Sequence, residues 1–598
     1  MCGVNLVMNF SQNGETAIQQ MMQATAHRGP DHAAWCQVND QLFVAGNRLK
    51  TVDLGDWSNQ PVQIDNGAFT LVWNGAIYNA DELRNHLLQA GVVFESRSDS
   101  EVLLKWLKAY GISGVKSLQG MYAVVFIDQS NQEVIIARDP HGKKPLYYFH
   151  ESSRWLFSSE SRSIIASGFI PKRLDNAQFV PYFYSRHSFP DKSFFEQVKQ
   201  VLPGKVLQLD FEGNIKKEQH VEIQAQSQKL PDKEGFRSLL SDAVLKHFHA
   251  DVPVGLMLSG GADSSLLLQC WTQETGIPLH TFTVSFEEKH RKKFPDPVHA
   301  QQVAAKYRCA HHEVLVTSKL LLQYLPDYIA SLDQPIGDSA SFLSWMIAKE
   351  AKPYVRILIS GAGADELFSG YNRHEAFRQY LHHKTFALKA AKSMGKFPFF
   401  GRHIKKLAKG IREDESITFL NFSSLRSIPE EYLSRFLDYY PKVLSPYKAA
   451  LEWDRGYYLV NDVLKIHDNA LMSHGIEGRA PYLDTALVRL SKSLTEEQHL
   501  SLSPKEWIKT LLADSGQAKV AVRKKAGFGL PLREWLEEDR ALQSLVFGTI
   551  KTFAQAQQDI IPREMLTLAL RPDKHVKHHF LEIWNLYILA AWCTYHQL

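Results

Sequence analysis

Cysteine is scarce in this chain, with five among 598 residues, at positions 2, 36, 270, 309 and 593. The number is odd and no CxxC spacing occurs, which argues against a disulfide framework and against a zinc site. No run of eighteen apolar residues occurs, so the sequence predicts no membrane span. The initial segment MCGVNLVMNF lacks a basic stretch, so we expect no secretory signal and a reducing, cytoplasmic setting.

An excess of charge is also lacking, because the formal net charge is only +4. This balance gives no reason to expect nucleic acid as a partner, and we predict small-molecule substrates instead. Hydrophobic residues make up 44% of the chain and charged residues 22%, as in ordinary globular proteins. A chain of this length is too long for one core and predicts two to four domains.

One basic stretch, residues 384–412, departs from this balance. Its cations before Glu413 include Lys389, Lys392, Lys396, Arg402, Lys405, Lys406 and Lys409. We interpret the stretch as the solvent-exposed face of a helical insertion. The alternative is a docking surface for an anionic partner or a membrane surface.

The hydrophobic pattern divides the chain into two parts. Residues 1–215 alternate strand-like runs with turn signals and a few helical patterns, which predicts a sheet-rich α+β domain. Residues 216–234 are polar and are interpreted as a linker. Residues 235–598 begin with short apolar strands between helices, which predicts a doubly wound α/β domain, and turn largely helical after Glu375.

The stretch from Val254 to Trp271 predicts an anion site. An apolar strand is followed by SGGADSS and then by a helical run. The glycines allow close approach of the backbone to a ligand, and unpaired N–H groups at a helix start attract phosphate. The pattern is not the GxxxxGK[ST] loop. Instead it resembles the pyrophosphate loop of ATP pyrophosphatases, which cleave ATP between the α- and β-phosphates.

Cys2 directly follows the initiator Met, and its small side chain makes Met1 a good candidate for removal. Cys2 would then carry a free α-amine beside its own thiol. An N-terminal amine has a pKa of about 8 and can serve as the general base for its own side chain.

Seven segments in order resemble the class II glutamine amidotransferases. They are MCGV at 1–4, HRGPD at 27–31, NRLKTVD at 47–53, WNGAIYN at 73–79, RSDSEV at 97–102, RDPHGKKPLYY at 138–148 and FSSE at 157–160. The resemblance implies an N-terminal-nucleophile fold of two stacked antiparallel sheets flanked by helices. It implies that Cys2 attacks the glutamine carboxamide and releases ammonia.

The same resemblance implies the other roles in this site. Asn74 and Gly75 would form the oxyanion hole, Arg48 would clamp the α-carboxylate of glutamine, and Asp99 would take its ammonium group. Further contacts to glutamine are implied for Leu49, Val52 and Ala76. The family usually reads NGEIYN where this chain reads NGAIYN. Ala76 removes one carboxylate, so we expect weaker glutamine binding without loss of the reaction.

Joined to the SGGADSS stretch, this domain resembles the asparagine synthetase family over nearly the whole chain. Matching segments include LHTFTVSF at 279–286, LDQPIGDSAS at 332–341, SGAGADELFSGYNRH at 360–374, DNALMSHGIEGRAPYLD at 468–484 and RKKAGFGLPLREW at 523–535. The resemblance implies ATP and Mg²⁺ as cofactors and a homodimer as a possible assembly.

Residue roles follow from that resemblance. Leu258, Ser259, Val284, Ser360 and Gly361 would hold AMP, and Gly260, Gly261, Asp263, Ser264 and Ser265 would form the pyrophosphate loop. Asp263 and Asp365 would bind Mg²⁺, which prefers one or two carboxylates with phosphate oxygens and water. Lys525, or its neighbour Lys524, would stabilise the departing pyrophosphate.

The implied reaction is adenylation of a carboxylate, most simply the aspartate side chain, followed by attack of ammonia to give an amide, AMP and pyrophosphate. An apolar passage between the domains is implied, because free ammonia would be lost to water. Many relatives carry an acidic residue where this chain has Ala362. Either Glu366, Asp365 or a water replaces it, or the acceptor is another carboxylate, such as a uronic acid or nucleotide-sugar of surface polysaccharide synthesis.

Overall fold

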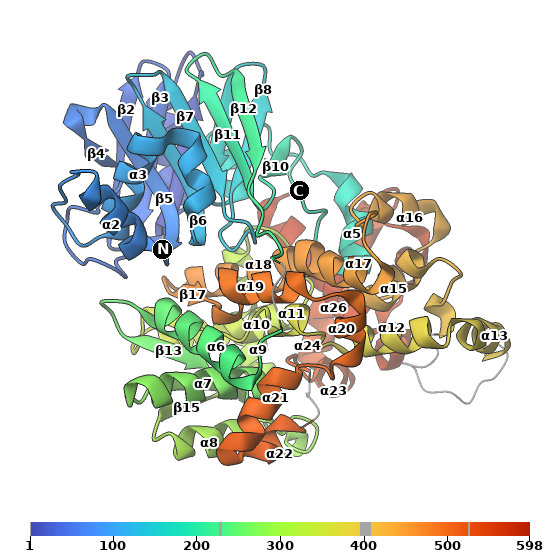
Figure 1. Cartoon of the computed structure of the whole chain (residues 1–598). Helices are drawn as coiled ribbons and strands as arrows, with labels where there is room; N and C mark the ends of the chain where they lie inside the picture. Colours follow the sequence, from blue (N-terminus) through green and yellow to red (C-terminus); the bar gives the residue numbers. More distant parts are fainter. Residues whose placement is uncertain (1, 227–229, 395–407, 524–526) are drawn as a thin grey trace.

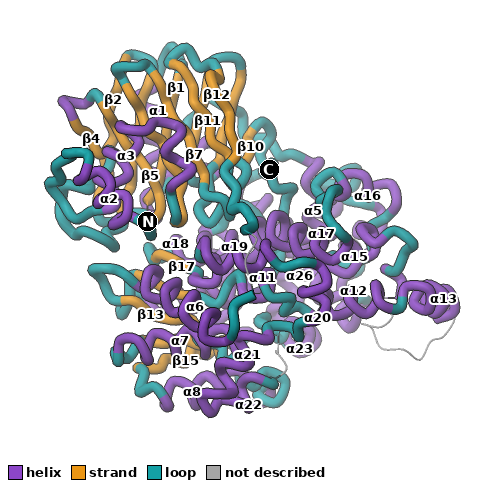
Figure 2. The backbone as a smooth tube through the Cα atoms, viewed as in Figure 1, coloured by secondary structure: helices purple, strands orange, loops and turns teal. Residues whose placement is uncertain are grey.

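A computed structural model describes residues 2–226, 230–394, 408–523 and 527–598. The first part of the chain forms two six-stranded antiparallel sheets (Figures 1 and 2). One has the order β10-β8-β9-β1-β3-β2 and the other β12-β11-β7-β6-β5-β4. Their bounds are β1 (Cys2–Met8), β2 (His32–Asn39), β3 (Leu42–Arg48), β4 (Val62–Ile64), β5 (Phe69–Ile77), β6 (Gly120–Asp128), β7 (Glu133–Arg138), β8 (Tyr147–Glu151), β9 (Arg154–Ser158), β10 (Val198–Gln200), β11 (Lys205–Asp210) and β12 (Ile215–His220).

The two sheets are stacked because their strands alternate apolar side chains between two faces. In β1, Val4 and Leu6 meet Val72 and Val125 of the other sheet, whereas Val7 packs in the core beneath α1 (Gly14–Ala24). The outer face of the second sheet is covered by α3 (Asp99–Gly114). Further helices are α2 (Ala80–Gln89), α4 (Ser161–Ala166) and α5 (Phe179–Ser185). The prediction of two stacked antiparallel sheets flanked by helices is confirmed.

The interpretation of residues 216–234 as a linker is wrong at its start. β12 extends to His220 and pairs antiparallel with β11. Most of its side chains are exposed, because β12 is the edge strand of its sheet. An edge strand with polar residues on both faces lacks the alternation that marks a half-buried strand, and charged residues are common on such edges.

The second part of the chain contains a five-stranded parallel sheet of order β15-β14-β13-β16-β17. Its strands are β13 (Val254–Met257), β14 (His280–Phe286), β15 (Ala310–Val316), β16 (Ile357–Ile359) and β17 (Glu477–Arg479). One face packs against α6 (Lys233–Phe248), α7 (Ala262–Thr275) and α8 (Asp296–Lys306), and the other against α9 (Ser318–Ser331), α10 (Ala340–Ala351) and α18 (Leu464–Met472). The predicted doubly wound α/β fold is confirmed.

The remaining elements are helical, as the sequence after Glu375 predicts. They are α11 (Ala364–Leu367), α12 (Asn372–His382), α13 (Lys384–Met394), α15 (Glu415–Ser423), α16 (Glu430–Leu437), α17 (Pro446–Trp453), a π-helical segment Asp454–Val463, α19 (Thr485–Ser493), α20 (Glu496–Ser501), α21 (Glu506–Leu512), α22 (Ala518–Ala521), α23 (Leu532–Glu538), α24 (Arg540–Ala556), α25 (Arg563–Leu570) and α26 (Val576–His596). Among the described helices, none combines the length and apolar character needed to cross a bilayer.

The basic stretch 384–412 is described at residues 384–394 and 408–412. Its helix α13 extends away from the rest of the molecule at the right of Figure 1. Lys384 pairs with Glu415. Four of the cations named above, Lys396, Arg402, Lys405 and Lys406, lie outside the described residues. The interpretation as a solvent-exposed insertion therefore stays a prediction, with a docking surface as its alternative.

Candidate active sites

Cys2 opens strand β1 and lies directly opposite Arg48 of β3. Its side chain is buried, with 6% exposed. The backbone N–H of Cys2 donates to Asn74 Oδ1 at 3.0 Å. Burial raises the pKa of the Cys2 thiol, while the backbone of Leu49 and the charge of Arg48 lower it. Cys2, Arg48 and Asn74 lie up to 72 positions apart in the chain. The structure brings these three residues together.

The side-chain amide of Asn74, which contacts the Cys2 backbone, has one nitrogen donor to spare. Its Oδ1 is taken by the Cys2 backbone, and its Nδ2 is buried with no hydrogen-bond partner in the described part of the chain. A buried unpaired donor is costly unless a ligand completes it. The next residue, Gly75, has no room for a side chain, because a Cβ there would lie 1.9 Å from the Met121 carbonyl oxygen. A side-chain amide and a backbone N–H, as Asn74 and Gly75 carry, are the kinds of donor that stabilise an oxyanion.

Arg48 holds the loop that follows it. Its guanidinium donates to the Gly55 carbonyl at 2.6 Å, to Asn59 Oδ1 at 2.9 Å and to the Asp53 carbonyl. Burial lowers the pKa of Arg48. All these partners are neutral, so an incoming carboxylate would be a stronger acceptor for the same fork of N–H groups. Of the other predicted glutamine contacts, Leu49 and Ala76 are buried and Val52 is half-buried.

Asp99 begins α3, and its Oδ2 accepts from the Ile77 backbone at 3.1 Å. Burial raises the pKa of the Asp99 carboxyl to about 6. Ile77 follows Ala76 in β5, so the carboxyl lies next to the position where the family carries an additional glutamate.

This environment predicts a pH dependence of glutamine binding. In the role that the resemblance implies, the ionised carboxylate of Asp99 would attract the substrate ammonium, and its raised pKa means that this charge is lost as pH falls through about 6. We expect the KM for glutamine to rise about tenfold for each pH unit below that value, while kcat at saturating glutamine changes less. The check is a glutaminase profile from pH 5 to 8, with ammonia-dependent synthesis as the control. A flat KM would contradict the role of Asp99.

In the second part of the chain, SGGADSS joins the end of β13 to the start of α7. Gly260 has φ +64°, and a Cβ there would lie 2.5 Å from the Ala300 backbone nitrogen. Ser264 Oγ accepts from the Ser259 backbone at 3.2 Å, and Ser259 Oγ accepts from the Gly261 backbone at 3.3 Å. These bonds shape the turn, as the sequence predicts for a phosphate loop.

The segment after β16 meets this loop. A Cβ on Gly361 would lie 3.0 Å from the Asp263 Cβ, so the two loops are in contact. Between them is a cavity of about 1070 Å³, which exceeds the usual range for one small ligand. The predicted residues that line it are Leu258, Ser259, Gly261, Asp263, Ser264, Val284, Ser360, Gly361, Ala362, Asp365 and Glu366. The lining does not include Gly260 or Ser265.

Lys505, which sequence reasoning missed, lies between the two predicted metal ligands. Its Nζ is 2.6 Å from Asp263 Oδ2 and 2.6 Å from Asp365 Oδ1. The other oxygen, Asp263 Oδ1, is buried and has no hydrogen-bond partner among the described residues. Two carboxylates that converge on a cation fit the donor set of Mg²⁺. The predicted Lys525 and its neighbour Lys524 lie outside the described residues.

In the same cavity, Glu366 follows Asp365 and lies four residues beyond Ala362. The Tyr371 hydroxyl donates to Glu366 Oε1 at 2.5 Å. Burial and the neighbouring Asp365 raise the pKa of Glu366 to about 7. Ala362 offers no carboxyl group, whereas Glu366 supplies one to the same cavity.

Family models match both parts of the chain. Residues 235–594 match asparagine synthase, and residues 1–220 match a glutamine amidotransferase domain. The chain belongs to the asparagine synthase family. It is thus a glutamine-hydrolysing amidotransferase of asparagine synthase type, and the family implies the use of ATP.

Relatives of this asparagine synthase-family enzyme match along its length. "Asparagine synthetase [glutamine-hydrolyzing] 1" of Bacillus subtilis (strain 168) is 28% identical, covering 99% of this chain and 96% of the relative. "Amidase chry2" of Gibberella zeae is 27% identical, covering 78% and 77%. The solved structure of B. subtilis glutamine phosphoribosylpyrophosphate amidotransferase aligns with 52% of this chain and 81% of its own, at 15% identity and a TM-score of 0.29.

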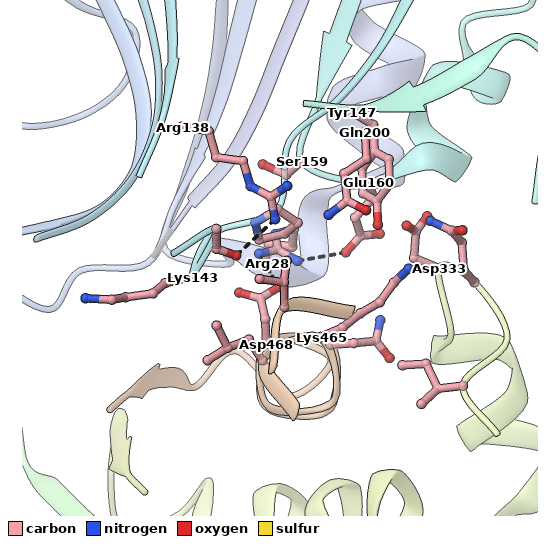
Figure 3. Close-up of a pocket in the computed structure, with 17 residues that line it drawn as sticks. Arg28, Arg138, Lys143, Tyr147, Ser159, Glu160, Gln200, Asp333, Lys465 and Asp468 are labelled. Atoms are coloured by element: carbon pink, nitrogen blue, oxygen red, sulfur yellow. Dashed lines mark hydrogen bonds and ion pairs between the residues drawn. The ribbon is translucent and has the colours of Figure 1, made fainter. Parts of the chain in front are cut away.

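The two parts of this asparagine synthase-family enzyme meet at a cluster of buried charges (Figure 3). Arg28 donates to the Cys2 carbonyl at 3.4 Å, to Glu160 Oε1 at 3.1 Å and to Asp468 Oδ2 on α18 at 2.8 Å. A cavity of about 30 Å³ beside it is also lined by Lys465, whose pKa burial lowers to about 8. The apolar passage expected for ammonia stays a prediction.

Removing one partner of this cluster should destabilise the protein. The Asp468→Ala variant removes one of the two carboxylates that pair with the buried Arg28 guanidinium, and breaking a buried pair costs about 3–5 kcal/mol. We expect the free energy of unfolding in urea to fall by that order. The control is Asp56→Ala, which removes the exposed ion pair with Lys50 and should change stability little. Equal effects of the two variants would contradict the buried pairing.

Proposed function

We propose that Cys2 hydrolyses glutamine to glutamate and ammonia, and that the second site adenylates a carboxylate, most simply the side chain of aspartate, and transfers the ammonia to it. The single observation that carries the proposal is that the backbone N–H of the buried Cys2 binds Asn74 Oδ1, while Asn74 Nδ2 has no partner among the described residues, in one chain with the cavity between the two loops. This pairing supplies a nucleophile and a donor for the oxyanion, and the cavity supplies room for ATP and an acceptor.

At the first site, the Cys2 amine of the mature chain would take the thiol proton as the sulfur attacks the glutamine Cδ carbon. The oxygen of the tetrahedral intermediate would be held by Asn74 Nδ2 and the Gly75 N–H. Collapse breaks the C–N bond, and the amine returns the proton to the departing ammonia. Water then hydrolyses the γ-glutamyl thioester and regenerates the thiol. Each oxyanion donor contributes about 3 kcal/mol.

At the second site, the backbone around Ser259 and Ser360 would hold the adenylate. Asp263 and Asp365 would hold Mg²⁺, which supplies charge neutralisation for the phosphates when bound. Lys505, whose Nζ lies 2.6 Å from both carboxylates, would supply a positive charge to the pyrophosphate, as the resemblance implies for Lys525 or Lys524. The acceptor carboxylate attacks the α-phosphorus, pyrophosphate leaves, and ammonia displaces AMP from the acyl group.

The charge of the cavity favours aspartate over the alternative acceptors. Glu366, Asp462 and Glu375 line it, and among the described residues of its lining carboxylates outnumber cations. A substrate that brings an ammonium group is complementary to such a lining, whereas a uronic acid or nucleotide-sugar adds negative charge. Glu366 would replace the acid that is missing at Ala362. Asparagine biosynthesis, a cytoplasmic location and a homodimer belong to the same proposal.

The experiment supplies purified enzyme with glutamine, Mg-ATP and aspartate. We expect glutamate, AMP and asparagine in equal amounts. Glutamate without asparagine would reject aspartate, and uronic acids and nucleotide-sugars would then be screened as acceptors by AMP release. Failure to release glutamate under any of these conditions would reject the proposed reaction at Cys2.

A further inference from the structure

Gln60 contacts the sulfur of Cys2, although neither the motifs nor the family resemblance singled it out. Its Nε2 lies 3.1 Å from Cys2 Sγ. The side chain belongs to the segment between β3 and β4 and is buried, with 2% exposed. A carboxamide this deeply buried must have its polar atoms paired, so its partners fix what it can do.

The orientation of the Gln60 amide follows from those partners. Its Oε1 accepts from the Trp73 backbone N–H at 2.7 Å, a bond that only the oxygen can make. The NH₂ group must therefore face the sulfur. Gly46 of β3 leaves space for the side chain, because a Cβ there would lie 2.7 Å from the Gln60 Cβ. Strand β5 thus holds the amide through Trp73, and β3 leaves room for the side chain at Gly46.

We infer that Gln60 is a further catalytic residue of the glutaminase site, which donates a hydrogen bond to the Cys2 sulfur and stabilises it as a thiolate. The inference rests on the proposed role of Cys2. A thiolate is a stronger acceptor than a thiol or a thioester, so the bond strengthens when charge is on sulfur. That occurs when the nucleophile forms and again when the thioester is hydrolysed, which makes the contact selective for the reacting states.

The surroundings of Cys2 give such a donor a purpose. Burial disfavours the charged sulfur and raises the pKa of the thiol. The amide compensates for part of that penalty without adding a charge to the site. It also limits the rotation of the Cys2 side chain, so the sulfur stays near Asn74 Nδ2, where the substrate oxygen would lie.

Two variants test the inference. Gln60→Met keeps the volume and removes the donor, and Gln60→Glu keeps the acceptor for Trp73 but turns a carboxylate oxygen toward the sulfur. A hydrogen bond to a charged group contributes enough to change reactivity by about ten- to hundredfold. We expect Cys2 alkylation by iodoacetamide at neutral pH to slow by that factor in Gln60→Met and further in Gln60→Glu. The pH midpoint of alkylation should rise by about one unit or more.

Steady-state kinetics separate catalysis from binding. We expect kcat for glutamine hydrolysis to fall by the same factor, with KM nearly unchanged and ammonia-dependent synthesis retained. The matched control is Gln63→Met, because Gln63 is exposed and its Nε2 contacts another thiol, Cys36 Sγ, at 3.7 Å. Its alkylation profile at Cys2 should equal that of the unmodified enzyme.

An unchanged pH midpoint in both Gln60 variants would overturn the inference. If both variants fail to fold, the inference is overturned as well, because Gln60 would then be needed for packing of the domain. Failure of the Cys2 proposal is recognised separately, since glutaminase activity would then survive in Cys2→Ala, whatever the Gln60 variants do.

Discussion

Cys2→Ala abolishes glutamine-dependent synthesis and leaves synthesis from added ammonia intact. This is the largest effect that we expect, because removal of a catalytic nucleophile commonly lowers kcat by about 10⁴-fold or more. The ammonia-dependent reaction is spared because the second site lies in a separate sheet, with its own loops after β13 and β16. The measurement is AMP formation with either nitrogen source.

The control for this variant is Cys36→Ala, a free cysteine on β2 that contacts neither cavity. It should keep both activities. Loss of ammonia-dependent synthesis in Cys2→Ala would show that the two sites are not separable. Retention of glutamine use would transfer the nucleophile to another residue.

The second large effect is expected at the two carboxylates that Lys505 joins. Asp263→Asn removes a predicted Mg²⁺ ligand, and the loss of several kcal/mol of charge stabilisation should slow adenylation by about 10³-fold. Glutaminase activity should persist, because Cys2 and its partners are untouched. Pyrophosphate release with saturating glutamine and aspartate is the measurement, and full activity would reject Asp263 as a ligand.

Lys505→Met gives a readout that needs no turnover. In the metal-free protein it removes the ammonium that lies 2.6 Å from both Asp263 and Asp365, so we expect a lower melting temperature that added Mg²⁺ partly restores. The control is Lys509→Met, which lines the same cavity without an ion pair to either aspartate among the described residues. A melting temperature of Lys505→Met that does not respond to Mg²⁺ would contradict the metal site.

Much of the fold and part of the site can be predicted because the signals are local. SGGADSS carries its strand, turn and helix start within a few residues, and Cys2, Asn74 and Gly75 lie in short motifs. The contacts of Lys505 and Gln60 could not be predicted, because their partners are 242 and 58 residues away and no pattern in the neighbouring sequence marks them. The interdomain pair of Arg28 and Asp468 is separated by 440 residues.

Strand β12 was not predicted for a different reason. Alternation of apolar and polar residues marks a strand with one buried face. The side chains of β12 are mostly exposed, because an edge strand has only one neighbour in its sheet. The π-helical segment before α18 and the charged lining of the interdomain cavity are equally invisible to periodicity, because they depend on how the two parts of the chain meet.

The loop that Arg48 holds is also fastened to the other half of the molecule. Asp251 Oδ2 accepts from the Asp53 backbone at 2.7 Å, and the Asp251 N–H donates to the Thr51 carbonyl at 3.0 Å. Asp251 lies three residues before β13, the strand that ends in SGGADSS. A fragment cut after residue 220 would keep the thiol and lose this anchor. The loop after Arg48 is thus held in place partly by the second part of the chain.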